Sequence, residues 1–322
     1  MKRKIFFFAI AISFTFLSCK EDFSPYGEFR QRYILTCVLR GDTTLQIATL
    51  SSSYFTGSPN PYEYTDDPSI RFADVRVWYE DSVYILHDST VNRINTSRYK
   101  TPESFYVSNR FKISQNKPIE IEVLLQNGKR LKANSVTPKE ILFNNLSDVL
   151  VPPVYGNLIT IIWGNGNANT FYLPKMYIRY SKKIGNQTTN HELEVPVRYT
   201  FEAGVEQPVY PSASNLLRVV YDRDVISKTL TYLKELEDEN SIISVYEKLS
   251  MKVAILDDNL TRYVSSTSQT FDDLTVRVNE SDYSNIDGGL GIFGSFIIKD
   301  YERLRFQESY ISSFGLSFIK EL

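Results

Sequence analysis

Residues 119–136 constrain the fold of this chain more than any other stretch. Apolar side chains occupy every second position of its first half, at Ile119, Ile121, Val123 and Leu125. A period of two is the pattern of a half-buried β-strand. Asn127 and Gly128 then supply the pair that a type I′ hairpin turn requires, and Leu131 and Ala133 continue the alternation. The stretch therefore predicts a β-hairpin.

The rest of the chain also predicts mainly β structure. Its 22 Tyr and 20 Phe, against 3 Met and 2 Trp, suit the pleated, half-buried surface of a sheet. We expect strands over residues 33–39, 44–50, 71–79, 82–86, 158–163, 170–180, 192–199, 216–221, 251–256 and within 291–318. One helix is expected over residues 225–236, where apolar residues share one face. Asp257-Asp258-Asn259 predicts the cap of a second, short helix that starts near Leu260.

The length and one irregular stretch predict two β-rich domains. Without an N-terminal signal at residues 1–18, 304 residues remain, more than one hydrophobic core usually serves. Pro152, Pro153 and Gly156 lie in a stretch without periodicity, so we place a linker at residues 144–157. The N-terminal domain, residues 31–143, is expected to be an immunoglobulin-like or transthyretin-like β-sandwich. Residues 158–322 are expected to form a second β-rich domain with one or two short helices.

The N-terminus predicts export and anchorage to a membrane. Three basic residues at positions 2–4 precede an uncharged, mostly apolar run of 13 residues, which is typical of a signal peptide and too short for a spanning helix. The run leads into Phe16-Leu17-Ser18-Cys19, which resembles the lipobox of bacterial lipoproteins. The resemblance implies cleavage after residue 18, lipidation of Cys19 and a tether over residues 19–30. The alternative is an ordinary secretory peptide that leaves Cys19 as a free thiol.

Two further segments resemble one family of lipoproteins. Lys20, Glu21 and Asp22 resemble a surface-export signal of Bacteroidota lipoproteins. Near the other end stands Tyr283-Ser284-Asn285-Ile286-Asp287-Gly288-Gly289-Leu290-Gly291-Ile292-Phe293-Gly294-Ser295. With the lipobox and the N-terminal sandwich, this segment is similar to Bacteroidota outer-membrane lipoproteins of domain-of-unknown-function family 4249. The resemblance implies a surface-facing outer-membrane protein beside a TonB-dependent receptor. It implies no reaction and no catalytic residues.

The glycine segment also matches a nucleotide motif. Gly289, Gly291 and Gly294 satisfy G-x-G-x-x-G, which binds a dinucleotide only between a preceding strand and a following helix. Here a polar stretch precedes the glycines, and an aromatic, β-branched stretch follows them. We therefore interpret these three glycines and Gly288 as structural, permitting positive φ and close backbone approach. No cofactor is expected.

No cluster of histidine or cysteine predicts catalysis or a metal site. His87 and His191 are the only histidines, and we place them near strand ends in different domains. A Ser-His-Asp triad would lack any nucleophile motif. With Cys19 lipidated, Cys37 alone remains, and its apolar surroundings predict a buried core residue. No disulfide and no cysteine-rich zinc site is therefore expected.

Charge excludes one further class of function. Removal of three positive charges with residues 1–18 changes the formal net charge from -2 to -5, so the chain has no electrostatic footprint for nucleic acid. Glu120 and Glu122 share a strand face, which we interpret as solvated rather than as a glycosidase pair. Three tripeptides resemble a Bacteroidota O-glycosylation acceptor, a hypothesis left open: Asp42-Thr43-Thr44, Asp81-Ser82-Val83 and Asp88-Ser89-Thr90.

The functional hypothesis rests on exposed loops. Residues 51–69 are rich in Tyr, Ser, Pro and Asp, and Tyr54, Tyr62 and Tyr64 are the candidate partner contacts. Tyrosine supplies a large contact area at low entropic cost. We expect a non-catalytic lipoprotein that binds a partner or ligand, accessory to a TonB-dependent receptor in nutrient uptake. The alternatives are a stand-alone surface glycan- or peptide-binding protein and an unrecognised hydrolase.

Overall fold

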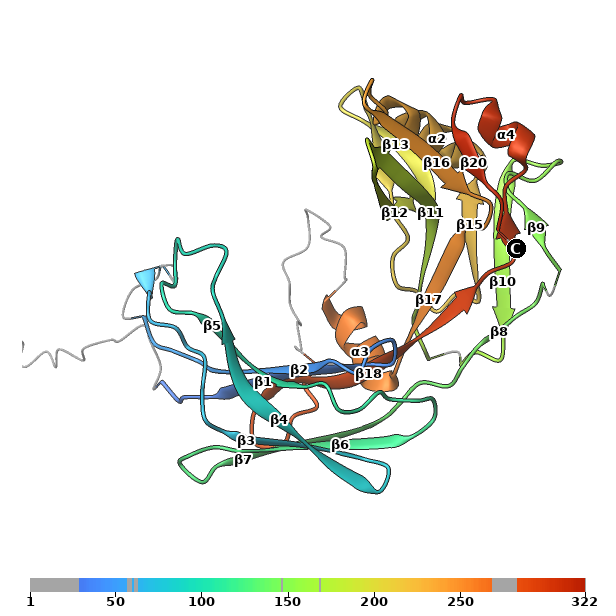
Figure 1. Cartoon of the computed structure of the whole chain (residues 1–322). Helices are drawn as coiled ribbons and strands as arrows, with labels where there is room; N and C mark the ends of the chain where they lie inside the picture. Colours follow the sequence, from blue (N-terminus) through green and yellow to red (C-terminus); the bar gives the residue numbers. More distant parts are fainter. Residues whose placement is uncertain are drawn as a thin grey trace, which may run out of the picture.

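The computed structural model describes residues 29–56, 60, 63–145, 147–167, 169–267 and 283–321. Within these residues the chain forms two lobes that are joined by one long strand (Figure 1). The first lobe is built from β1–β7, and the second lobe from β8–β17, β19 and β20 with helices α2 and α4. The prediction of a mainly β chain with short helices is confirmed.

The first lobe is a β-sandwich whose two layers share one strand. Its strands are β1 (Tyr33–Arg40), β2 (Gln46–Ser52), β3 (Asp74–Tyr79), β4 (Ser82–Val91), β5 (Glu103–Ser108), β6 (Pro118–Leu124) and β7 (Arg130–Val136). The first half of β4 pairs with β3 and its second half with β5, so β4 turns the corner between the layers. Cys37 lies in the core between the layers, as predicted. Its burial raises the pKa of the thiol to about 12.

The predicted hairpin forms, but with a different turn. β6 and β7 pair over their whole lengths, from Pro118 opposite Val136 to Leu124 opposite Arg130. A type I′ turn needs positive φ at both central residues, whereas Gly128, at φ 82°, is the one turn residue in that region. Leu125 N–H donates to the Lys129 carbonyl, which closes a three-residue loop. The Asn127 amide instead donates to the Tyr33 hydroxyl at 2.7 Å, a contact between distant strands that the local sequence does not encode.

The second lobe surrounds a separate hydrophobic core. Its strands are β8 (Leu142–Phe143), β9 (Val149–Leu150), β10 (Leu158–Gly164), β11 (Tyr172–Ile184), β12 (Gln187–Val195), β13 (Arg198–Glu202), β14 (Val205–Val209), β15 (Arg218–Asp222), β16 (Ser241–Tyr246), β17 (Ser250–Leu256), β19 (Leu304–Arg305) and β20 (Ser317–Ile319). Its helices are α2 (Asp224–Glu235) and α4 (Glu308–Ser312). α2 confirms the helix predicted over residues 225–236, because Ile226, Leu230 and Leu233 are buried on one face.

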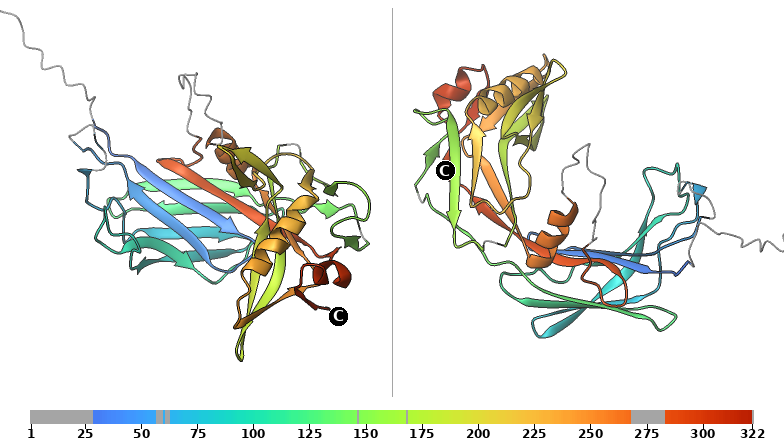
Figure 2. Two further views of the ribbon diagram at one scale, coloured as in Figure 1. Left: turned by 90° about the horizontal axis from the view of Figure 1, so that it is seen from above. Right: turned by 180° about the vertical axis from the view of Figure 1, so that it is seen from behind.

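One strand, β18 (Leu290–Tyr301), runs through both lobes (Figure 2). Leu290 to Phe296 pair in parallel with β1, and Phe296 to Tyr301 pair antiparallel with β17. A single 13-stranded sheet therefore continues from the first lobe into the second. The predicted boundary at residues 144–157 does not separate the two lobes completely. Ile286 and Phe293 come from the C-terminal part of the chain but lie in the core of the first lobe. β1 and β18 are separated by some 250 residues, so no local sequence pattern predicts that they pair in parallel.

Candidate functional site

The predicted partner loop lies at one end of the first lobe. Tyr54 and Tyr64 stack with ring centroids 4.0 Å apart and ring planes 9° from parallel. Arg98, from the neighbouring loop, donates to the Tyr54 hydroxyl at 2.6 Å and to the Tyr64 carbonyl at 3.2 Å. Both tyrosines are half-buried, so they support the loop as well as line its surface. Tyr62, Cys19 and the segment Lys20, Glu21 and Asp22 lie outside the described residues.

Asp67 joins the two loops at this end. It accepts hydrogen bonds from the Ser69 amide at 2.9 Å, the Arg93 guanidinium at 2.6 Å and the Thr101 hydroxyl at 3.0 Å. Partial burial by itself raises the pKa of Asp67, but the hydrogen bonds from Ser69, Arg93 and Thr101 outweigh that effect and lower the pKa to about 2. The ionised carboxylate therefore holds residues 63–69 against residues 92–101.

Asp67→Asn should loosen these loops in a pH-dependent way. A folded pKa near 2 against an ordinary value of 3.8 corresponds to about 2 kcal/mol of stability. Because the folded pKa is the lower one, this stability is present above pH 3.8 and is lost as the pH falls towards 2. The difference in melting temperature between wild type and variant should therefore shrink over that interval. Asp66→Asn, an exposed neighbour, is the control; a pH-independent difference for Asp67→Asn contradicts the assignment.

Large apolar side chains are exposed near the loops that Asp67 joins. The Phe29 and Phe55 rings lie 5.9 Å apart and are each about half exposed, at 48% and 50%. Ile94, on the loop that Asp67 holds through Arg93, is fully exposed. We refer to Phe55 and Ile94 on these two loops, together with Phe29 packed against Phe55, as the apolar tip.

The glycine segment is built into the sheet that joins the lobes. Gly288 and Gly291 adopt φ of 78° and 113°, which L side chains rarely adopt. A Cβ atom on Gly291 would lie 2.0 Å from the Leu35 carbonyl oxygen, and one on Gly289 would lie 2.7 Å from the Tyr33 carbonyl oxygen. A Cβ on Gly294 would meet Asp257 Oδ1 at 3.0 Å. The strand β18, rather than a helix, follows these glycines, so the fold lacks the helix N-terminus that a dinucleotide site of this type uses.

Asp257 ties the glycine strand to the first lobe. Its carboxylate accepts hydrogen bonds from the Ser135 and Ser295 hydroxyls at 2.7 and 2.8 Å. The same side chain accepts the Leu260 amide at 2.8 Å and so caps α3 (Asp258–Thr267), the predicted second helix. Burial raises the pKa of Asp257, while these hydrogen bonds oppose the rise. One side chain therefore connects β7, β18 and the start of α3.

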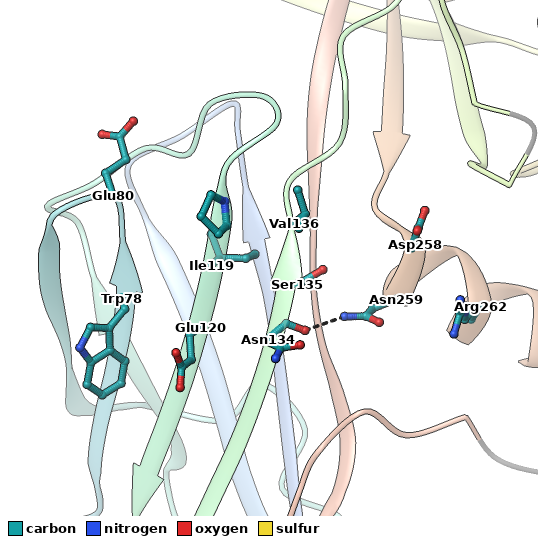
Figure 3. Close-up of a pocket in the computed structure, with 11 residues that line it drawn as sticks. Trp78, Glu80, Ile119, Glu120, Asn134, Ser135, Val136, Asp258, Asn259 and Arg262 are labelled. Carbon is teal, nitrogen blue, oxygen red and sulfur yellow. Dashed lines mark hydrogen bonds between the residues drawn. The ribbon is translucent and has the colours of Figure 1, made fainter.

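A groove opens between α3 and the outer face of the first lobe (Figure 3). Its volume is about 660 Å³. Trp78 and Glu120 face each other across the β3–β6 pair, and Asn134 lies opposite Glu120 on β7. Asp258 and Arg262, one turn apart on α3, form the other side. The Asn259 amide donates to the Asn134 carbonyl at 2.9 Å and links the two sides.

The charged groups of this groove differ in their pairing from those of the adjacent cross-strand row, in which Arg76, Glu122 and Lys132 lie opposite one another on β3, β6 and β7. In that row Arg76 pairs with Asp74 at 2.6 Å, and Glu122 pairs with Lys132 at 2.8 Å. Within the described part of the chain, by contrast, Glu120, Asp258 and Arg262 make no ion pair or side-chain hydrogen bond. The groove therefore presents two carboxylates and one guanidinium that none of the residues described by the structure engages.

The histidines lie within strands rather than near strand ends. His87 is exposed on β4, and His191 on β12 stacks on Tyr180 and contacts the Thr189 hydroxyl at 2.7 Å. No group of three or more His, Cys, Asp or Glu side chains among the described residues is placed to hold a metal ion. The helices that the structure describes are too short or too polar to span a membrane.

Comparison with known proteins identifies the family. A family model described as Domain of unknown function (DUF4249) matches residues 20–302. The chain belongs to the DUF4249 family. A search of curated proteins finds no match. Among solved structures, this DUF4249 protein is similar to the crystal structure of CBD12 from CALX1.2, at 8% identity over 84% of this chain and 100% of that one. The TM-score of 0.17 is too low for this likeness to carry an argument.

The groove was not predicted from the sequence. The alternation over residues 71–79 points Val75, Val77 and Tyr79 into the core, which leaves Trp78 on the outer face. An outward tryptophan was the available signal. No feature of the sequence indicates that Arg262 lines a groove, because α3 lies beside the sheet only in the tertiary structure.

Proposed function

We propose that this DUF4249 protein is a non-catalytic, lipid-anchored protein of the bacterial outer membrane, facing the cell surface, that binds a TonB-dependent receptor as an accessory in nutrient uptake. The observation that carries the proposal is the apolar tip. Ile94 stands on the loop that Asp67 holds through Arg93, and Phe55 follows Tyr54, which Arg98 of the same loop binds. Phe29 packs against Phe55, so these exposed side chains suit a preformed protein contact.

The position of the apolar tip supports a partner in the membrane. Phe29 follows Cys19 by ten positions in the sequence. A fully extended chain spans at most about 3.3–3.6 Å per residue, so a lipid on Cys19 would hold the tip within roughly 35 Å of the bilayer surface. A receptor embedded in the same membrane is thus within reach of the tip. A lipidated cysteine with more than one acyl chain anchors stably, because each buried CH₂ contributes about 0.8 kcal/mol.

Purification of the tagged chain from membranes of its native host tests the partnership. A TonB-dependent receptor should be recovered with the wild-type chain. The double variant Phe55→Ser/Ile94→Ser should lower that recovery at least fivefold. Phe201→Ser is the matched control, because Phe201 is equally prominent, at 76% exposed, but lies on β13 of the second lobe.

Two results would overturn the proposal separately. Repeated purification that recovers no receptor refutes the partnership. Absence of palmitate labelling, or membrane fractionation that Cys19→Ser leaves unchanged, refutes the anchor. The second candidate function, binding of a glycan or peptide, is favoured by a different observation, the groove beside Trp78.

A further inference from the structure

We propose that the groove beside Trp78 binds a neutral oligosaccharide. The groove lies against α3, whereas the apolar tip lies on the loops of residues 51–69 and 92–101. Saccharide binding therefore does not depend on the proposed receptor partnership, and each can fail without the other.

Trp78 supplies a flat apolar surface for a sugar ring. It lies on the outer face of β3, half-buried, with Val83 beside it on β4 and Glu120 beside it on β6. The carbon-bound hydrogens of a pyranose ring pack against an aromatic face, while the ring hydroxyls project sideways towards polar groups. At about 660 Å³ the groove falls within the size range of small-molecule sites. It is open to solvent, which suits a chain of sugars.

The polar groups around Trp78 match hydroxyl chemistry. Glu120 and Asp258 present acceptors, Arg262 presents donors, and the Asn134 side chain presents both. All of these groups are planar and can make two parallel hydrogen bonds to neighbouring hydroxyls. A sugar hydroxyl donates and accepts at once, so one ligand can satisfy all of them.

The mixed charges exclude charged ligands. An anionic ligand would meet the carboxylates of Glu120 and Asp258, which form no ion pair with any residue that the structure describes. A cationic ligand could pair with those carboxylates but would leave the Arg262 guanidinium unsatisfied. Glu80, at the rim, is already paired with Lys117 at 3.2 Å. A neutral ligand with many hydroxyls is the class that can hydrogen-bond to the carboxylates and to the guanidinium.

The groove is held open before any ligand arrives. Asp257 fixes the start of α3 to β7 through Ser135, and Asn259 ties the same turn to the Asn134 carbonyl. The two sides therefore keep their separation, which reduces the entropic cost of binding.

Binding of neutral gluco-, manno- and xylo-oligosaccharides of three to six units tests the proposal. The full chain is purified in a detergent without a sugar headgroup, and affinity is measured by calorimetry. The chain has two tryptophans, and Trp163 is buried at 1% exposure, so a saccharide-dependent change in fluorescence reports on Trp78. We expect at least one series to bind and to shift that fluorescence.

Variants separate stacking from general damage to the fold. Trp78→Ala should weaken binding at least tenfold, and Glu120→Gln and Arg262→Gln should each weaken it several-fold. Arg76→Gln, in the adjacent ion-paired row, should leave affinity unchanged. Unfolding midpoints establish that each variant is folded. Absence of binding to all three series, affinity indifferent to Trp78→Ala, or binding of a lysine-rich peptide in their place would overturn the proposal.

Discussion

Gly291→Ala is expected to cost more stability than any other single substitution considered for this protein, about 4 kcal/mol or more. The added Cβ would lie 2.0 Å from the Leu35 carbonyl oxygen and 2.8 Å from the Leu35 carbonyl carbon. Both are backbone atoms of the strand paired with β18, so neither can move aside without separating the strands. The φ of 113° adds strain for any residue with a Cβ. Urea unfolding, or the yield of folded protein where the variant does not fold, measures the loss.

A second glycine provides the control for Gly291→Ala. A Cβ on Gly164, at the end of β10, would meet Asn144 Oδ1 at 3.6 Å, an ordinary contact distance. Gly164→Ala should therefore change the free energy of unfolding by less than about 1 kcal/mol. If the two variants unfold at the same urea concentration, close approach of β18 to β1 is not what the glycine segment provides.

Asp257→Ala is expected to destabilise the protein by about 2–4 kcal/mol. Loss of the α3 cap costs about 1 kcal/mol. The Ser295 hydroxyl, at 0% exposure, would also lose its acceptor, and an unsatisfied buried polar group costs about 1–3 kcal/mol. Because Ser135 loses the same acceptor, β7 should separate from α3. Equilibrium unfolding gives the total, and hydrogen exchange of the α3 amides should show which element loosens.

Asp258, the neighbouring residue, distinguishes the hydrogen-bonding role of Asp257 from a general effect of negative charge. Asp258 is exposed and follows Asp257 directly, so Asp258→Asn removes a similar charge without removing the cap or the serine contacts. Its effect should stay below about 0.5 kcal/mol. Equal losses from Asp257→Ala and Asp258→Asn would show that charge near the helix start, rather than the buried network, stabilises this junction.

The Asp257 network also connects stability to the proposed saccharide site. α3 carries Asp258 and Arg262 on one side of the groove, while β3 and β6 carry Trp78 and Glu120 on the other. A variant that releases α3 should widen the groove and weaken binding without touching a lining side chain. The apolar tip, which is held by Asp67, should be unaffected.

Local patterns explain which elements the sequence predicts well. The hairpin of β6 and β7 and the helix α2 follow from alternation and from a repeated apolar face, and both depend on residues within one short stretch. The predicted turn type was wrong, because positive φ occurs at Gly128 but not at Asn127 and the hairpin closes through a three-residue loop. The contact of Asn127 with Tyr33 of a distant strand is a tertiary feature of this turn. β18 could not be assigned to the first lobe, because its partner β1 lies near the other end of the chain.

The sequence by itself determined the mainly β class, the hairpin, the two helices, the cap of the second helix and the burial of Cys37, since each follows from neighbouring residues and their hydropathy. Only the tertiary structure decided that β18 joins the lobes, that Asp257 meets Ser135 and Ser295, and that Trp78 and Arg262 line the same groove. These features depend on chain segments more than 35 residues apart, whose approach is set by the packing of whole sheets.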